Sequence, residues 1–306
     1  MRIEKFINCQ DHTGERPYWD AETSAFYWID VFGQRIHRRN ADGEIQTWSV
    51  PSLIGSLALI NPGYALVSLH NGIFIFEFKS GRSELVGFPD PGVAGNLRLN
   101  DGKVDPAGRF VCGGADYFRS QPIAGLYSVD SCLGMKRLGG EIIVANGLAW
   151  SPDGSWFYFA DSFRHTIYRA AYDLQSGTVG TPNPFAHFST DEGMPDGACI
   201  DVEGYLWVAM VYGGKLVRLC PDGTRDCEVL MPVSAPTSVA FGGPAMDRLF
   251  VTSKSRDSKG NELDPGLGGS VFVVDGLPTR GSAEKRFDCT DSLLIIGSNL
   301  LTNKKA

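Results

Sequence analysis

Short apolar runs separated by turn residues extend along the whole chain. FYWID from Phe26, WFYFAD from Trp156 and YLWVAM from Tyr205 are rich in aromatic and β-branched residues, with the period-two alternation typical of strands. Asn-Ala-Asp-Gly at 40–43 and Pro-Asp-Gly at 152–154 and 221–223 mark turns between such runs. No segment keeps a helical period, so the pattern predicts an all-β chain.

Six stretches of the chain repeat one order of features: a polar or glycine-containing start, an apolar run, an Asp/Gly turn and a second aromatic run. They begin near residues 14, 53, 98, 145, 194 and 236. The corresponding positions lie 39 to 50 residues apart and are Glu15, Ile54, Asp101, Asn146, Asp196 and Thr237. A four-stranded propeller blade takes about 40 to 50 residues. We therefore predict a single domain over residues 1–306, a six-bladed β-propeller, rather than two sandwiches, which need no common spacing.

The ends of the chain and two longer segments stand outside this repeat. A strand over about residues 2–8 is expected to close the ring with the last blade, because closure removes exposed strand edges. Residues after about 288 extend beyond the sixth unit and receive no place in the ring. Segments 115–125 and 255–269 interrupt blades three and six, and we expect them to form loops that shape access to the channel.

The repeat places polar side chains around the propeller axis, because the innermost strand of each blade runs along the channel. Four of the six corresponding positions, Glu15, Asp101, Asn146 and Asp196, carry carboxylate or amide oxygens. Carboxylates brought together repel one another, and a bound divalent cation with a preference for oxygen ligands relieves that repulsion. The alternative is that Asp or Asn before Gly merely forms turns, but this leaves Glu15 unexplained.

Composition and charge exclude several classes of partner. The chain has 28 Lys and Arg against 35 Asp and Glu, a net charge of −7, and no basic stripe of the kind that nucleic-acid binding requires. It lacks an apolar stretch of about 18 residues and the apolar core of a signal peptide, so no membrane association is expected. Its seven cysteines lack CxxC spacing, which favours a reduced, cytoplasmic protein. A monomer is the expected state.

Four motifs resemble those of the gluconolactonase, regucalcin and senescence-marker-protein family. GERPYWD, RLNDGKVDPAGRF, NGLAWSPDG and MPDGACID occur in the family's order, and the resemblance covers roughly residues 10 to 285. It implies a six-bladed propeller with one divalent metal in the channel and the hydrolysis of sugar lactones. It also implies that Glu15, Asn146 and Asp196 are metal ligands and that Arg98 and Asn100 contact the substrate.

The sequence departs from the family pattern at two places. Arg16 stands where the family commonly has glycine, and Val111–Ala115 replaces a Trp and Gly-Thr-Met. Both departures are expected to border the pocket and to affect the choice of substrate. Asp101 is expected to contact substrate or to help hold Arg98 or a water molecule.

The function that these features predict is the metal-dependent opening of a sugar (aldono-)lactone ring, a step of carbohydrate metabolism. The metal would polarise the carbonyl and activate water, and Asp196 would act as the base. Calcium is the first choice of metal, with Zn²⁺, Mn²⁺, Mg²⁺ and Fe²⁺ as alternatives. The chain has no GxSxG, HExxH or phosphate-loop motif. The alternatives are a hydrolase of another lactone or of an organophosphate ester, and a non-enzymatic calcium-binding regulator.

Overall fold

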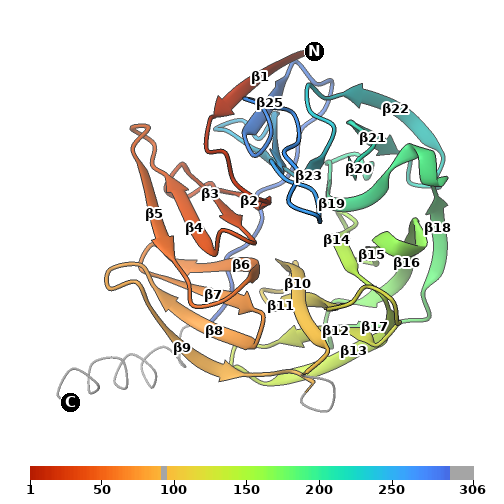
Figure 1. Cartoon of the computed structure of the whole chain (residues 1–306). Helices are drawn as coiled ribbons and strands as arrows, with labels where there is room; N and C mark the ends of the chain where they lie inside the picture. Colours follow the sequence, from red (N-terminus) through yellow and green to blue (C-terminus); the bar gives the residue numbers. More distant parts are fainter. Residues whose placement is uncertain (91–94, 290–306) are drawn as a thin grey trace.

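Six antiparallel sheets surround a central channel, which confirms the prediction of an all-β, six-bladed propeller (Figure 1). The computed structural model describes residues 1–90 and 95–289. The innermost strands, one per blade, are β2 (Gly14–Asp20), β6 (Ile54–Asn61), β10 (Leu97–Val104), β14 (Ala145–Trp150), β19 (Met194–Ile200) and β23 (Pro236–Gly242). Two single-turn 3₁₀ helices, η2 (Ser162–Arg164) and η3 (Thr190–Glu192), are present. No helix of the described residues has the length and apolar character needed to span a membrane.

The remaining strands of each blade follow outward from the channel. The first three blades add β3 (Ala25–Asp30), β4 (Arg35–Arg39), β5 (Ile45–Ser49), β7 (Tyr64–Leu69), β8 (Gly72–Glu77), β9 (Arg82–Gly87), β11 (Phe110–Asp116), β12 (Ala124–Val129) and β13 (Met135–Ile142). The last three add β15 (Trp156–Asp161), β16 (Thr166–Asp173), β17 (Thr178–Val179), β18 (Asn183–His187), β20 (Leu206–Val211), β21 (Lys215–Leu219), β22 (Arg225–Leu230), β24 (Arg248–Ser253), β25 (Val271–Asp275) and β1 (Arg2–Ile7). Both β17 and β18 pair with β16.

The N-terminal strand closes the ring, as the sequence predicts. β1 pairs antiparallel with β25, with Arg2 opposite Asp275 and Ile7 opposite Val271 (Figure 1). The buried side chains of Ile7 and Val271 belong to one apolar cluster with Phe26 of the first blade. The two ends of the propeller sequence therefore complete one sheet, and this sheet packs against the first blade.

The second strand of each blade is buried on both faces, because each blade packs between two neighbours. All six residues of β3 are buried, although its sequence, AFYWID, was expected to alternate. By contrast, all five residues of β5 at the outer edge remain at least partly exposed. The nearly continuous apolar runs of the sequence thus reflect sheets covered on both sides.

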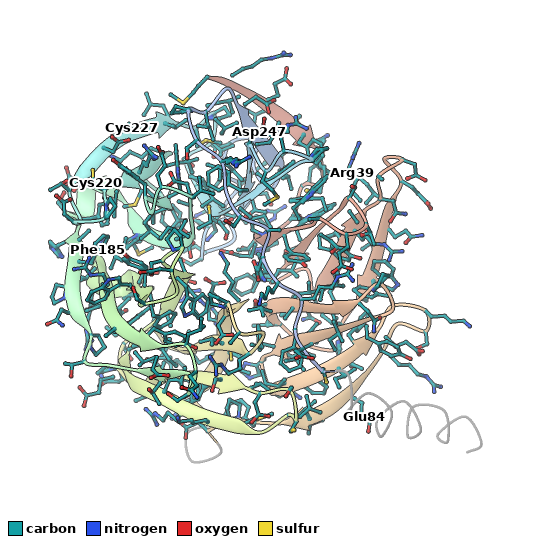
Figure 2. The ribbon with its side chains drawn as sticks, turned by 180° about the vertical axis from the view of Figure 1, so that it is seen from behind. Arg39, Glu84, Phe185, Cys220, Cys227 and Asp247 are labelled. Atoms are coloured by element: carbon teal, nitrogen blue, oxygen red, sulfur yellow. The ribbon has the colours of Figure 1, made fainter. Side chains whose placement is uncertain are left out.

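The segment from residue 276 to 289 crosses the mouth of the channel seen from behind in Figure 2. The backbone amides of Gly281 and Phe287 donate to the carbonyls of Met246 in blade six and Leu59 in blade two, both at 2.8 Å. This segment therefore bridges several blades on one side of the ring. The expectation for the tail after about 288 falls on residues 290–306, which lie outside the described residues.

Glu284 of this segment forms an ion pair with the buried guanidinium of Arg16. The Arg16 guanidinium donates to both Glu284 carboxylate oxygens, through Nη1 at 3.0 Å and through Nη2, and its Nε donates to the Leu57 carbonyl at 3.0 Å. Arg16 has a left-handed φ of +51°, the conformation that favours glycine. Its side chain, 2% exposed, does not line the cavity at the opposite mouth, so the expectation that Arg16 borders the pocket is wrong.

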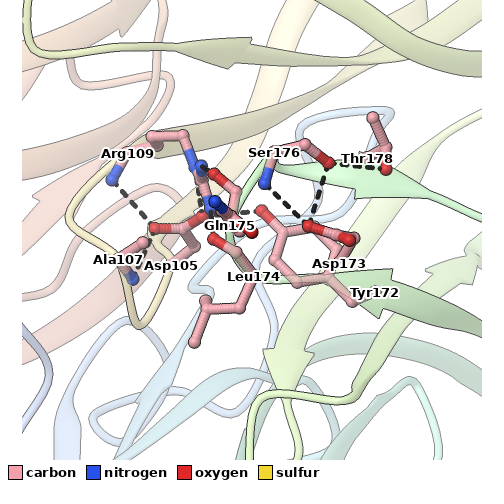
Figure 3. Close-up of polar contacts among 9 residues, drawn as sticks. All are labelled: Asp105, Ala107, Arg109, Tyr172, Asp173, Leu174, Gln175, Ser176 and Thr178. Atoms are coloured by element: carbon pink, nitrogen blue, oxygen red, sulfur yellow. Dashed lines mark hydrogen bonds and ion pairs between the residues drawn. The ribbon is translucent and has the colours of Figure 1, made fainter.

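Asp105 joins blade three to blade four (Figure 3). Its buried carboxylate accepts hydrogen bonds from the amide of Ala107 at 2.9 Å, from Arg109 Nε at 2.7 Å and from the Tyr172 hydroxyl at 2.6 Å. Arg109 in turn donates to the Leu174 carbonyl at 2.6 Å. The turn between β10 and β11 is thereby fixed against β16 of the next blade.

Replacing Glu284 by Ala tests the contribution of the C-terminal segment to stability. The change leaves the buried Arg16 guanidinium without its partner, so we expect the free energy of unfolding to fall by about 3–5 kcal/mol. Guanidinium denaturation measures it. Glu22→Ala is the control, because Glu22 is an exposed partner of Arg286, and its loss is expected to cost about 1 kcal/mol or less. Equal small effects of the two changes would contradict this account.

Candidate active site

A cavity of about 90 Å³ opens at the channel mouth where the inner strands begin. The five expected site residues that line it are Glu15 of blade one, Arg98 and Asn100 of blade three, Asn146 of blade four and Asp196 of blade five. Side chains that are far apart in the sequence thus meet in one cavity. Asp101, the sixth expected residue, does not line it.

A break in strand pairing shapes the backbone at Glu15, Asn146 and Asp196. The register shifts directly after Glu15 in β2 and after Asn146 in β14, and it shifts across Asp196 in β19. Such bulges bend a strand and redirect its side chains, and they are frequent beside active sites. Asn146 and Asp196 therefore lie inside bulged strands and not in turns, so the turn-forming interpretation is wrong for both.

The glycines that follow Asn146 and Asp196 allow neighbouring inner strands to approach closely. A Cβ on Gly147, whose φ is +62°, would lie 2.7 Å from the Asp196 carbonyl oxygen. A Cβ on Gly197 would lie 2.0 Å from Ser238 Oγ. Packing between blades thus requires glycine here, and the same packing brings Asn146 and Asp196 to the axis.

Two amide side chains in the cavity wall are held by a chain of hydrogen bonds. Asn100 Nδ2 donates to the Ala145 carbonyl at 2.9 Å and to Asn146 Oδ1 at 2.6 Å. Asn146 Nδ2 donates to Ser162 Oγ at 2.9 Å, and the Ser162 hydroxyl donates to the Pro195 carbonyl at 2.7 Å. The chain spans blades three to five and fixes the orientation of both amides.

Asp101 is bound to the backbone of the next blade. Its carboxylate accepts from the amides of Gly102 and Gly147, both at 2.8 Å, and from Leu148 at 3.4 Å. Among the described residues it forms no hydrogen bond to Arg98, which differs from the expected arrangement. Because Gly147 directly follows Asn146, the contacts of Asp101 hold the backbone beside a cavity residue.

Burial and mutual repulsion disfavour the ionised forms of the two carboxylates in the cavity. Burial, with a further contribution from Asp101, raises the pKa of Asp196 to about 7, although Lys254 and Arg98 act in the opposite direction. Burial and the neighbouring charge of Asp196 raise the pKa of Glu15 well above its usual value. A divalent cation between these groups would favour their ionised forms.

The donor set fits a cation that prefers oxygen. In the part of the chain that the structure describes, no three His, Cys, Asp or Glu side chains are grouped to hold a metal. The candidate ligands are instead the two carboxylates of Glu15 and Asp196 with the amide oxygen of Asn146, which line the same cavity from three blades. Carboxylate and amide oxygens suit Ca²⁺ or Mg²⁺, whereas zinc sites usually include nitrogen or sulfur ligands.

Sequence reasoning missed two cationic residues of the cavity, Arg119 and Lys254. Arg119 belongs to segment 115–125, which was expected to shape access, and Lys254 directly precedes segment 255–269. Lys254 Nζ donates to the Tyr212 hydroxyl at 3.1 Å. The positions of these two segments in the sequence indicated that they lie near the channel mouth. They did not indicate which of their side chains, or of the residues beside them, line the cavity.

Aromatic side chains also line the cavity. Phe32, Phe163 and Tyr212 are 39%, 37% and 42% exposed, and each contributes to its wall. They come from blades one, four and five, so aromatic surface is present on several sides of the cavity. Apolar ring faces of this kind suit the C–H faces of a small cyclic ligand.

Val111–Ala115, the second departure from the family pattern, does not border the cavity. These residues belong to β11 and are buried. A Cβ on Gly113 would lie 2.3 Å from the Ala145 Cβ, so this part of the strand packs blade three against blade four. The expectation that the departure borders the pocket is wrong, and it no longer supports a different ester as substrate.

Comparisons with known proteins identify the family of this chain. The model of the SMP-30/Gluconolactonase/LRE-like region matches residues 13–255, a range that includes all five cavity residues predicted from the sequence. The chain belongs to this family.

Relatives within the SMP-30/gluconolactonase/LRE-like family align over nearly the whole chain. A 6-deoxy-6-sulfogluconolactonase of Pseudomonas putida is 36% identical over 277 residues, which is 90% of this chain and 94% of that protein. Regucalcin of Gallus gallus is 34% identical over 92% of this chain and 96% of its own. The solved structure of a luciferin-regenerating enzyme superposes with a TM-score of 0.87 at 29% identity, covering 93% of this chain and 98% of that chain.

The variant Asp196→Asn tests two expectations about the cavity: that its carboxylates repel each other, and that Asp196 is a metal ligand. At pH 8 the change removes one of two repelling carboxylates, so we expect the Tm of the metal-free protein to rise by about 1–2 °C. We expect CaCl₂ to raise the Tm of the wild-type protein and not that of the variant, because the variant lacks one of the candidate ligands. Differential scanning calorimetry measures both.

The matched control is Asp201→Asn, which removes a buried carboxylate that pairs with Arg218 away from the cavity. It should lower the Tm of the metal-free protein and leave the calcium-induced increase intact. A full calcium response in Asp196→Asn would contradict the assignment of Asp196 as a ligand.

Proposed function

We propose that this protein hydrolyses the ester bond of a sugar lactone. The observation that carries the proposal is the meeting of Glu15, Arg98, Asn100, Asn146 and Asp196 in one cavity at the channel mouth. Membership of a family named for gluconolactonase supports it, as does the similarity to a 6-deoxy-6-sulfogluconolactonase. The substrate class is therefore a small polyhydroxylated cyclic ester.

In this proposal Glu15, Asn146 and Asp196 hold one divalent cation, with calcium as the first candidate because all the donors are oxygens. When bound, the cation supplies positive charge that polarises an ester carbonyl and makes water more acidic. The hydrogen bond from Asn146 Nδ2 to Ser162 keeps the other end of the Asn146 amide, its oxygen, in place. Asp101 acts through the backbone of Gly147 to position Asn146.

The other cavity residues bind and orient the lactone. Arg98 Nη1 is buried and has no hydrogen-bond partner among the described residues, so it is available to donate to a substrate oxygen. The Asn100 amide nitrogen is already engaged, which leaves its carbonyl oxygen to accept from a sugar hydroxyl. Asp196 accepts the proton of the attacking water, and a positioned base of this kind contributes about 10²–10⁴ in rate.

A pH-indicator assay on a panel of aldonolactones tests the proposal. We expect chelation to abolish hydrolysis and one of Ca²⁺, Mg²⁺, Mn²⁺, Zn²⁺ or Fe²⁺ to restore it. Asp196→Asn should lower kcat by about 10²-fold or more, because it removes both the base and a ligand. Asp222→Asn, a change in an exposed turn that does not line the cavity, is the control and should retain full activity.

Failure of the metal-replete protein to exceed the spontaneous rate on every lactone would overturn the proposal. Tight metal binding without turnover would instead favour the alternative of a calcium-binding protein without catalytic activity. The two outcomes are separated by measuring calcium affinity calorimetrically on the same preparation.

A further inference from the structure

The cavity contains more positive charge than a neutral sugar requires. Its wall includes three cationic side chains, Arg98, Arg119 and Lys254, and two carboxylates, Glu15 and Asp196. Within residues 1–90 and 95–289, none of the three cations forms an ion pair with a carboxylate. Both carboxylates are the candidate ligands of a divalent cation, so all the charged side chains of the cavity that remain to contact a substrate are positive.

The Arg98 guanidinium has a buried hydrogen-bond donor for which the described part of the chain supplies no acceptor. It lies in β10, on the inner strand of blade three, and its Nη1 is buried without a hydrogen-bond partner among the described residues. Buried donors of proteins are nearly always paired, because an unpaired one loses its hydration without compensation. A ligand that accepts a hydrogen bond from Arg98 would remove this cost.

Arg119 adds a second guanidinium to the same wall, and the two repel each other. Burial, followed by the charge of Arg119, lowers the pKa of Arg98 to about 10. Arg119 is held in a tight turn, with φ at +56° and its amide donating to the Asp116 carbonyl at 3.0 Å. Its guanidinium carbon lies 6.0 Å from the centre of the Phe163 ring, which also lines the cavity. The turn therefore fixes the position from which Arg119 reaches the cavity.

Two arginines placed together fit an anion better than a hydroxyl. A neutral hydroxyl can be bound by a neutral amide such as Asn100, which already lines the cavity. Two guanidinium groups in one cavity repel each other. A bound oxyanion offsets this repulsion, because it accepts charge-assisted hydrogen bonds from both groups. Lys254, on the wall formed by blade six, adds a third positive charge to the field that such a substrate meets.

We propose that Arg98 and Arg119 bind an anionic substituent of the lactone, a sulfonate, phosphate or carboxylate group, and that Arg119 is a specificity-determining residue. The preferred substrate is then an acidic sugar lactone rather than a neutral one. This inference rests on the proposed lactonase function and names the substrate class for the same site.

The test compares kcat/KM for glucono-1,5-lactone with the values for its 6-phospho and 6-deoxy-6-sulfo derivatives and for a glucarolactone. We expect at least one acidic lactone to be favoured by 10-fold or more in the wild-type protein. Arg119→Gln should lower the ratio of kcat/KM for the acidic lactone to kcat/KM for the neutral lactone by at least 10-fold. Arg119→Lys should restore part of the preference, because it keeps the charge and loses the two-pronged geometry.

Lys136→Gln is the matched control, since it removes one positive charge from the exposed outer strand of the same blade. It should leave the preference unchanged. Raising the ionic strength from about 0.05 to 0.5 M should weaken the preference for the acidic lactone, because salt screens the partly exposed Arg119.

The outcomes separate this inference from the function on which it rests. Hydrolysis of the neutral lactone as fast as every acidic one would overturn the anion site and leave the lactonase function standing. If no lactone is hydrolysed, the lactonase function fails, and calorimetric binding of 6-phosphogluconate against gluconate decides the anion site. We expect at least 10-fold tighter binding of 6-phosphogluconate, lost in Arg119→Gln; equal binding of the two would overturn the inference.

Discussion

The pairing of β1 with β25 holds the ring of blades together, and the geometry of the cavity depends on it. Five of the six blades each contribute a few side chains to the cavity, so the distances between these side chains are set by the positions of the inner strands around the axis. At the seam between the last and first blades, Thr237 Oγ1 donates to the Gly14 carbonyl at 2.5 Å, directly beside Glu15. An open ring would expose the edge of β25 and release this contact.

Buried charges are paired at one mouth of the channel and unpaired at the other. Behind the ring, Arg16 is paired with Glu284, and the C-terminal segment covers the pair. At the cavity, Glu15 and Asp196 repel each other, and Arg98 has an unpaired buried donor. Unsatisfied charge costs stability, so its concentration at one mouth supports the proposal that ligands bind there. The paired charges at the other mouth belong to the structure that supports this site.

The repeat in the sequence was sufficient to predict the fold and to place three of its four acidic or amide positions, Glu15, Asn146 and Asp196, in the cavity, because blade spacing and ring closure are regular. It also placed Asp101 in the cavity, where the structure has its neighbour Asn100. Both residues lie within the register shift between Leu99 and Gly102 of β10, and the spacing of the repeat does not determine which of the two faces the axis. Arg119 was missed because it belongs to an insertion with no counterpart in the other blades. The direction of Arg16 depends on Glu284, a partner 268 residues away that no local pattern reveals.

Anomalous diffraction from crystals of the protein grown with Ca²⁺ is the most direct test of the central claim, which is that three blades supply the ligands of one cation. The account predicts a single strong anomalous peak at the channel mouth, with oxygens of Glu15, Asn146 and Asp196 at about 2.3–2.6 Å. A peak bound by other side chains, or the absence of any peak at the channel mouth under saturating calcium, would contradict it.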